Sequence, residues 1–295
     1  SDRNMFGQVR GMKKHSRQDR CFLCALFAVF LGLMSSGTVV RADASEKENR
    51  PDDKQNISLS TPEKIRNKLI PDDERLYYSV SFRGIPAGAS VLRIQRGVRC
   101  NDTETVMFKV VSRTNKFFSV FYKTEDVVRS HVHKGKYYSL RFDKDLNEKE
   151  YQRREKIEFD YDAKKALITR KTGKGYKKKE EVSVPIEKPC FDPLSALFYL
   201  RHFKLRKGRD IRLPVCASKK IWEVVVHCIG EERITLVKLG TFQAIKVKID
   251  TKFEGIFIHK GEITMWMEKT TGIVLYAQVK IPIGQVVVSL DAVKN

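Results

Sequence analysis

The chain has 295 residues and a formal net charge of +21, from 57 Lys and Arg against 36 Asp and Glu. Such a charge predicts attraction to anionic partners but says nothing about the fold. The basic residues are scattered through the chain instead of gathered on one recognition helix, which argues against nucleic acid as the partner.

Residues 1–42 are predicted to be a cleavable signal peptide. An uncharged apolar run, Cys21–Met34, follows a basic stretch and precedes small-residue cleavage patterns around Ala42 and Ala44. The run is shorter than the about 20 residues of a membrane span, with an uncleaved anchor as the alternative. No Cys stands at the cleavage point, which argues against a lipoprotein. We therefore expect export to the periplasm and a mature chain without a transmembrane span.

The rest of the chain divides into a linker and one domain. Residues 43–74 are polar and charged, contain three prolines, and are predicted to form a largely disordered linker. Residues 75–295 have a normal size for a single β domain. Residues 1–42 hold seven Lys or Arg and two Asp or Glu, so their removal leaves a charge of about +16.

From Arg75 onward the dominant pattern is an alternation of apolar and polar residues, which is typical of strands with one buried face. Runs of this kind, separated by glycine-containing turns, are found at residues 78–82, 106–110, 222–228, 245–249 and 286–290. They predict a mainly β protein, an antiparallel meander of about ten to twelve strands. So many strands curl or close, and we expect an open or partial barrel.

The stretch Arg141–Glu181 is crowded with charges of both signs, which nearly balance. We expect long hairpins whose charged residues face solvent, with a basic docking finger around Lys177–Lys179 as the alternative. The apolar residues expected to turn inward are Ile157, Phe159, Ala166 and Ile168.

One helix is predicted, from Pro193 to Lys207. Asp192 is a good N-cap, Pro193 suits the first helical position, and Gly208 supplies a left-handed stop. The first two turns are apolar on nearly all sides, so the helix is expected to be buried with the sheet curled around it. Arg201 and Lys204 predict that one side of this helix is more exposed to solvent, and His202 would lie on that side.

Four segments, taken in order along the chain, resemble one family of proteins. The segments are Leu76–Gly88, Asp192–Arg201, Lys238–Val247 and the terminal strand Gly284–Leu290. The family consists of exported bacterial proteins and is called domain of unknown function 3108. The resemblance implies an envelope protein whose sheet wraps a helix, similar to the periplasmic lipoprotein carriers. It implies no established activity, and no ligand residue transfers from it.

Four cysteines follow residue 42, an even number for an oxidising compartment. Cys216 and Cys228 would lie about 23 Å apart along a hairpin, too far for a disulfide. Cys190 precedes a helix of roughly 24 Å, and a strand of similar length returns to Cys216. The two cysteines would therefore lie close together. A Cys190–Cys216 disulfide is therefore one hypothesis, and buried free thiols are the other.

Catalytic signatures are missing from the sequence: it contains no Gly-x-Ser-x-Gly elbow, no phosphate-binding glycine loop and no His-Glu-x-x-His pair. His131 and His133 lie two residues apart on a strand but lack an evident third metal ligand. Ser195 beside Asp192 is expected to serve in first-turn hydrogen bonding. We expect a non-enzymatic protein without a cofactor or metal.

Two functions are open on this evidence. The first is a binder of a lipid or other apolar ligand between the helix and the curved sheet. The second is an interaction or scaffold protein of the cell envelope, with peripheral contact to anionic glycan, lipid head groups or a protein through its basic surface. Trp266 shares the polar face of its strand, so it would be either a surface contact or part of the sheet's open mouth. The candidate ligand-lining residues are Leu197, Phe198, Leu200, Phe203, Trp222 and Trp266.

Overall fold

A computed structural model describes residues 71, 73–119, 124–148, 152–250, 262–281 and 284–294. The predicted signal peptide and nearly all of the predicted linker lie outside these ranges. No helix within them is long and apolar enough to cross a membrane.

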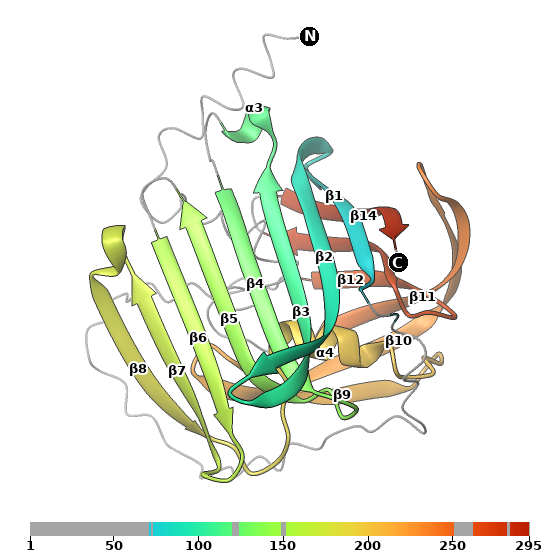
Figure 1. Cartoon of the computed structure of the whole chain (residues 1–295). Coiled ribbons are helices and arrows are strands. Elements are labelled where there is room, and N and C mark those ends of the chain that lie inside the picture. Colours follow the sequence, from blue (N-terminus) through green and yellow to red (C-terminus); the bar gives the residue numbers. More distant parts are fainter. Residues whose placement is uncertain are drawn as a thin grey trace, which may run out of the picture.

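The described residues form a single sheet of 14 strands in which every neighbouring pair is antiparallel (Figure 1). The strands in chain order are β1 (Arg75–Phe82), β2 (Ile85–Cys100), β3 (Thr103–Thr114), β4 (Thr124–His133), β5 (Ser139–Glu148), β6 (Gln152–Asp160), β7 (Lys165–Thr172), β8 (Lys178–Pro185), β9 (Asp210–Ala217), β10 (Lys220–Leu236), β11 (Gly240–Asp250), β12 (Glu262–Glu268), β13 (Val274–Ile281) and β14 (Gly284–Lys294).

The strand order places the first and last strands next to each other in the middle of the sheet. It runs from β8 down to β1 and then from β14 down to β9, so β8 and β9 are the two edges. The edges do not pair with each other in the described part of the chain, and the barrel is therefore open. The side chains of Lys219, in the β9–β10 turn, and Glu180, on β8, nevertheless form an ion pair at 2.5 Å. The sheet therefore curls far enough for side chains near its two edges to meet.

The predicted fold is confirmed, with two more strands than the upper estimate. The charged stretch Arg141–Glu181 contributes to four strands, β5 to β8. The four apolar residues expected to turn inward there are all buried: Ile157, Phe159, Ala166 and Ile168.

Within the described ranges, three short helical elements accompany the sheet: α3 (Lys116–Ser119), η3 (Lys174–Tyr176) and α4 (Pro193–Leu200). The predicted helix is α4, which lies inside the curl of the sheet and contacts β4 and β9 (Figure 1). Its N-terminal signals are confirmed, since Asp192 is the N-cap and Pro193 follows it.

The predicted C-terminal boundary of this helix was wrong, because α4 ends at Leu200 and not at Lys207. The backbone N–H groups of Arg201, His202 and Phe203 bond to carbonyls three residues earlier, which tightens the last turn. Gly208 does adopt a left-handed conformation, with φ of 75°, but its N–H donates to the Cys228 carbonyl on β10 at 3.0 Å. Gly208 thus fastens a separate turn to the sheet instead of ending the helix.

Candidate functional site

The N-terminus of α4 is fixed to the concave face of the sheet through Asp192. One carboxylate oxygen accepts hydrogen bonds from the hydroxyls of Ser130 on β4, at 2.5 Å, and Ser139 on β5, at 2.6 Å. The other accepts the backbone N–H groups of Leu194 and Ser195 at 2.8 and 2.9 Å. Burial raises the pKa of Asp192, while these hydrogen bonds oppose the shift.

The Ser195 side chain completes the cap, as predicted, by accepting the Asp192 backbone N–H at 2.9 Å. The contributions of Ser130 and Ser139 were not predicted. Both serines occupy buried positions of their strands, and Ser130 lies between the buried residues Val128 and Val132. A serine at a buried position of an alternating strand needs a hydrogen-bond partner inside the protein. The two serines could therefore have indicated a buried polar partner.

The middle of α4 packs against the sheet through aromatic rings. Phe198 stacks on Phe108 of β3, with ring centroids 3.8 Å apart and planes inclined by 9°. Tyr199 stacks on Phe191, just before the helix, at 4.4 Å. Aromatic contacts of this kind add to the stability gained from burial, so this face of the helix is part of the core.

The C-terminus of α4 is held by a buried ion pair. The guanidinium of Arg201 donates to both carboxylate oxygens of Glu74, at 2.6 and 3.0 Å, and to the Thr271 carbonyl at 3.2 Å. A Cβ on Gly272 would lie 2.9 Å from the Cα of Arg201, so the chain passes closely here. Glu74, placed in the linker by the sequence interpretation, therefore belongs to the domain.

The expectation of a wet helix side at Arg201 and His202 was wrong, since both residues are buried. Arg201 points toward Glu74, and the His202 ring packs on that of Tyr137 at 4.5 Å. The charge on Arg201 is matched by a residue that precedes β1, and this pairing is not visible in the local sequence.

The predicted ligand-lining residues of α4 are mostly core residues. Phe198 and Leu200 are buried, and Leu197 and Phe203 are partly buried against the same core. Phe203 also lines a small cavity beyond the end of the helix. The structure thus brings these four together as packing partners of the sheet.

The two predicted tryptophans lie on opposite faces. Trp222 shares the inward face of β10 with Val224 and Val226, and its ring N–H donates to the Ala217 carbonyl at 2.9 Å. Trp266 alternates with the buried Met265 and Met267 and so points to the outer face, apart from α4. Its ring N–H donates to Glu232 at 2.7 Å, and Tyr276 packs edge-on against it. Trp266 is itself buried, with 9% of its surface exposed, so its ring offers little area for a surface contact.

Cys190 and Cys216 lie on neighbouring segments, because Phe191 forms a parallel bridge with Val215. Both thiols are buried and free in the structure. Burial raises the pKa of Cys190 to about 12 and also raises that of Cys216. The disulfide between them stays a prediction.

A cluster of charged residues is buried on the concave face of β4 to β7, and we call it the polar row. Glu155 pairs in register with Lys144 on one side and Arg170 on the other. Its carboxylate accepts from Arg170 at 2.7 Å and from Arg153 at 3.0 Å. The residues of the polar row are Asp126, Lys144, Arg153, Glu155 and Arg170.

The expectation that the charges of Arg141–Glu181 face solvent was wrong for three members of the polar row, Lys144, Arg153 and Glu155, which are buried. Lys144 shares its face with Phe142 and Leu146, and Glu155 shares its face with Ile157 and Phe159, all of which are buried. Burial, followed by repulsion from Arg153, lowers the pKa of Lys144 to about 8. Burial pushes the pKa of Glu155 up, but Arg153, Arg170 and Lys144 outweigh it, and the pKa is lowered.

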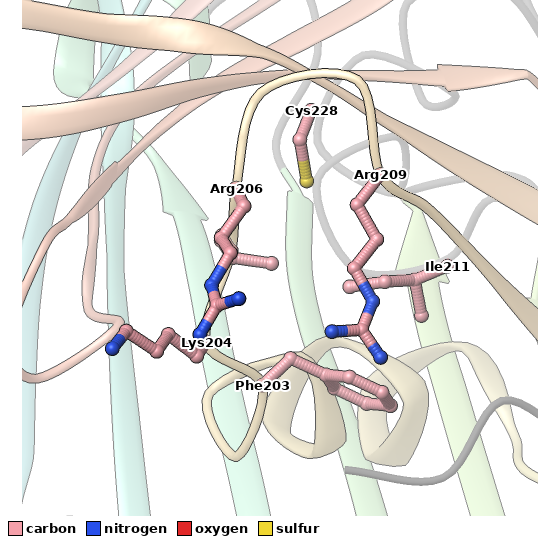
Figure 2. A pocket seen from close by; sticks show the side chains of 7 residues that line it. Phe203, Lys204, Arg206, Arg209, Ile211 and Cys228 are labelled. Atoms are coloured by element: carbon pink, nitrogen blue, oxygen red, sulfur yellow. The ribbon is translucent and has the colours of Figure 1, made fainter. Parts of the chain in front are cut away.

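Beyond α4 the chain makes an exposed basic turn, which we define as Lys204, Arg206, Lys207 and Arg209 around the buried Leu205. Beneath it lies a shallow pit with an enclosed volume of about 10 Å³, enough for one water molecule (Figure 2). The residues that line the pit are Phe203, Lys204, Leu205, Arg206, Arg209, Ile211 and Cys228.

No set of three or more His, Cys, Asp or Glu side chains in the described ranges is arranged to hold a metal ion. His131 instead shares a hydrogen bond with Thr105 at 3.2 Å, and burial lowers its pKa.

Comparison with known proteins decides the family. The family described as "Protein of unknown function (DUF3108)" matches residues 77–291. The chain belongs to this family. The resemblance predicted from the four sequence segments is confirmed. No curated protein matches the chain.

Among solved structures, the DUF3108 chain is similar to a crystal structure from Brucella abortus, described as a beta-barrel-like protein of domain of unknown function DUF1849. The two share 14% sequence identity with a TM-score of 0.47, over 76% of this chain and 97% of the other.

Proposed function

We propose that this protein is an exported, non-enzymatic periplasmic protein that contacts an anionic component of the cell envelope through its basic surface. The basic turn carries the proposal. It exposes four cations within six residues, and three of them line one pit. Clustered cations of this kind raise the local concentration of anionic ligands.

The interior supports surface contact over the carriage of an apolar ligand. Helix α4 is fixed at one end by Asp192, at the other by Arg201, and in the middle by the stack of Phe198 on Phe108. The pit at its end encloses about 10 Å³, whereas ligand sites typically have several hundred. An apolar ligand placed between α4 and β3 would have to separate Phe198 from Phe108.

The buried reactive groups also have structural partners. Asp192 and Ser195 form the helix cap, and Glu155 is held between two arginines. We therefore assign these groups to stability and not to a catalytic step.

Native mass spectrometry and lipid extraction of protein purified from periplasm would test the proposal. We expect the mass of the chain cleaved near residue 42, without a tightly bound apolar ligand. Recovery of a stoichiometric lipid would support the carrier function instead. Purification of the protein from the cytoplasm, with residues 1–42 still attached, would contradict export.

A further inference from the structure

We propose that the pit between Arg206 and Arg209 binds a phosphate group, as either a lipid head group or a soluble phosphate ester. The inference rests on the proposed function and names the chemistry of its ligand. Figure 2 shows the two guanidinium groups on opposite sides of the opening, with the Cys228 sulfur directed between them. A planar guanidinium group can donate two parallel hydrogen bonds to two oxygens of a phosphate, which favours phosphate over a monatomic anion.

The turn that carries the two arginines is fixed in place. The Arg209 N–H donates to the Arg206 carbonyl at 3.1 Å, which closes the turn. The Gly208 N–H donates to the Cys228 carbonyl at 3.0 Å, which fastens the turn to β10. The backbone that carries both arginines is thus fixed before any ligand arrives, and less backbone entropy is lost on binding.

The base of the pit is apolar. Leu205, Ile211 and Cys228 are buried there, and Phe203 is partly buried beside them. An anion held over such a base is less screened by water, which strengthens its attraction to the arginines. The pit itself has room for about one water molecule, so the phosphate group would lie at its mouth, between the two arginines, and an acyl chain would stay outside.

The acidic residue nearest in sequence, Asp210, does not cancel the charge of the turn. Its carboxylate lies 2.9 Å from the Nδ1 atom of His227 on β10. The turn thus carries four cations, while the carboxylate that follows it in the sequence is engaged by His227.

A pair of charge-matched variants tests the pit. R206Q/R209Q removes two charges from it, and K177Q/K178Q removes two exposed charges from the η3–β8 region, outside the pit. With phosphatidylglycerol vesicles, we expect R206Q/R209Q to weaken binding about tenfold or more, since charge-assisted hydrogen bonds are lost. The control should weaken it less than about threefold, as a general charge effect. R206K/R209K keeps the charge but loses the planar fork, and we expect an intermediate loss.

Amide chemical shifts measured during titrations with inorganic phosphate and with glycerol 3-phosphate test the site without a membrane. We expect saturable shifts at residues 204–209 in the wild-type protein and none there in R206Q/R209Q. Shifts from glycerol 3-phosphate without vesicle binding would identify a soluble ester as the ligand and would contradict membrane contact while supporting the pit.

Equal losses of vesicle binding in the two glutamine variants would overturn the pit and leave the proposed function intact. Phosphate shifts that map away from residues 204–209 would overturn it as well. Absence of both vesicle binding and phosphate shifts in the wild type would remove the pit and the membrane contact together.

Discussion

The carboxylate of Asp192 and the hydroxyl of Ser139 lie 2.6 Å apart, although 53 residues separate them in the chain. This hydrogen bond joins the cap of α4 to β5. The same hydroxyl accepts the Asp192 backbone N–H, also at 2.6 Å. One serine thus satisfies two buried polar groups at the point where the helix meets the sheet.

Ser139→Ala should therefore lower the free energy of unfolding by about 1–3 kcal/mol, because it leaves buried polar groups of Asp192 with fewer partners. Urea denaturation followed by circular dichroism measures the loss. Ser183→Ala, on the exposed face of β8, is the control and should change stability by less than about 0.5 kcal/mol. Equal effects of the two substitutions would contradict the role given to the cap.

Gly272→Ala tests the close passage beside Arg201. Gly272 and Gly240 both have positive φ, of 68° and 83°, but only at Gly272 would a Cβ meet another atom within 4 Å. Gly240→Ala should cost about 1–2 kcal/mol of stability from backbone strain alone. Gly272→Ala should cost about 1–3 kcal/mol more, from the contact with the Arg201 backbone. Similar midpoints of urea unfolding for the two variants would show that this contact is unimportant.

Lys144 should make stability depend on pH in the alkaline range. Its pKa is lowered from 10.5 to about 8 in the folded protein, so the unfolded chain binds more protons between these values. Stability from this group therefore rises as the pH increases from about 8 to about 10.5. Lys144→Met removes that rise, on the order of 1–3 kcal/mol. Parallel urea titrations of both proteins over this range measure the difference, and identical pH profiles would show that Lys144 is not so perturbed.

The predicted disulfide between Cys190 and Cys216 can be tested by mass mapping. If the oxidised pair forms, non-reducing digestion of periplasmic protein should yield one peptide pair joined through these residues, while Cys228 stays available to alkylation after unfolding. Alkylation of Cys190 in the unfolded but unreduced protein would contradict the disulfide. Cys190→Ser alone would then be expected to alter stability only through its lost packing.

Much of the fold is predictable because strand alternation and helix caps are local signals. Tyr78, Val80 and Phe82 alternate with polar residues, and all three are buried as that pattern requires. Asp192 and Pro193 likewise mark the start of α4 correctly. Neither signal depends on a distant part of the chain.

The end of α4 and the polar row depend on distant partners. Arg201 suits a continuing helix locally, but its side chain pairs with Glu74, 127 residues away. From the local sequence alone, Lys144 and Glu155 are expected to be surface charges. Their pairing becomes visible only from the sheet register, in which Glu155 on β6 lies between Lys144 on β5 and Arg170 on β7. The basic turn was not predicted as a separate feature, because most of it was included in the predicted helix Pro193 to Lys207.

Flotation of the wild-type protein with vesicles across a series of salt concentrations tests the central claim most directly. The account predicts binding to phosphatidylglycerol vesicles at low salt, little binding to phosphatidylcholine vesicles, and release as salt screens the exposed cations. Binding that is equal for both lipids, or that survives high salt, would contradict contact through the basic surface.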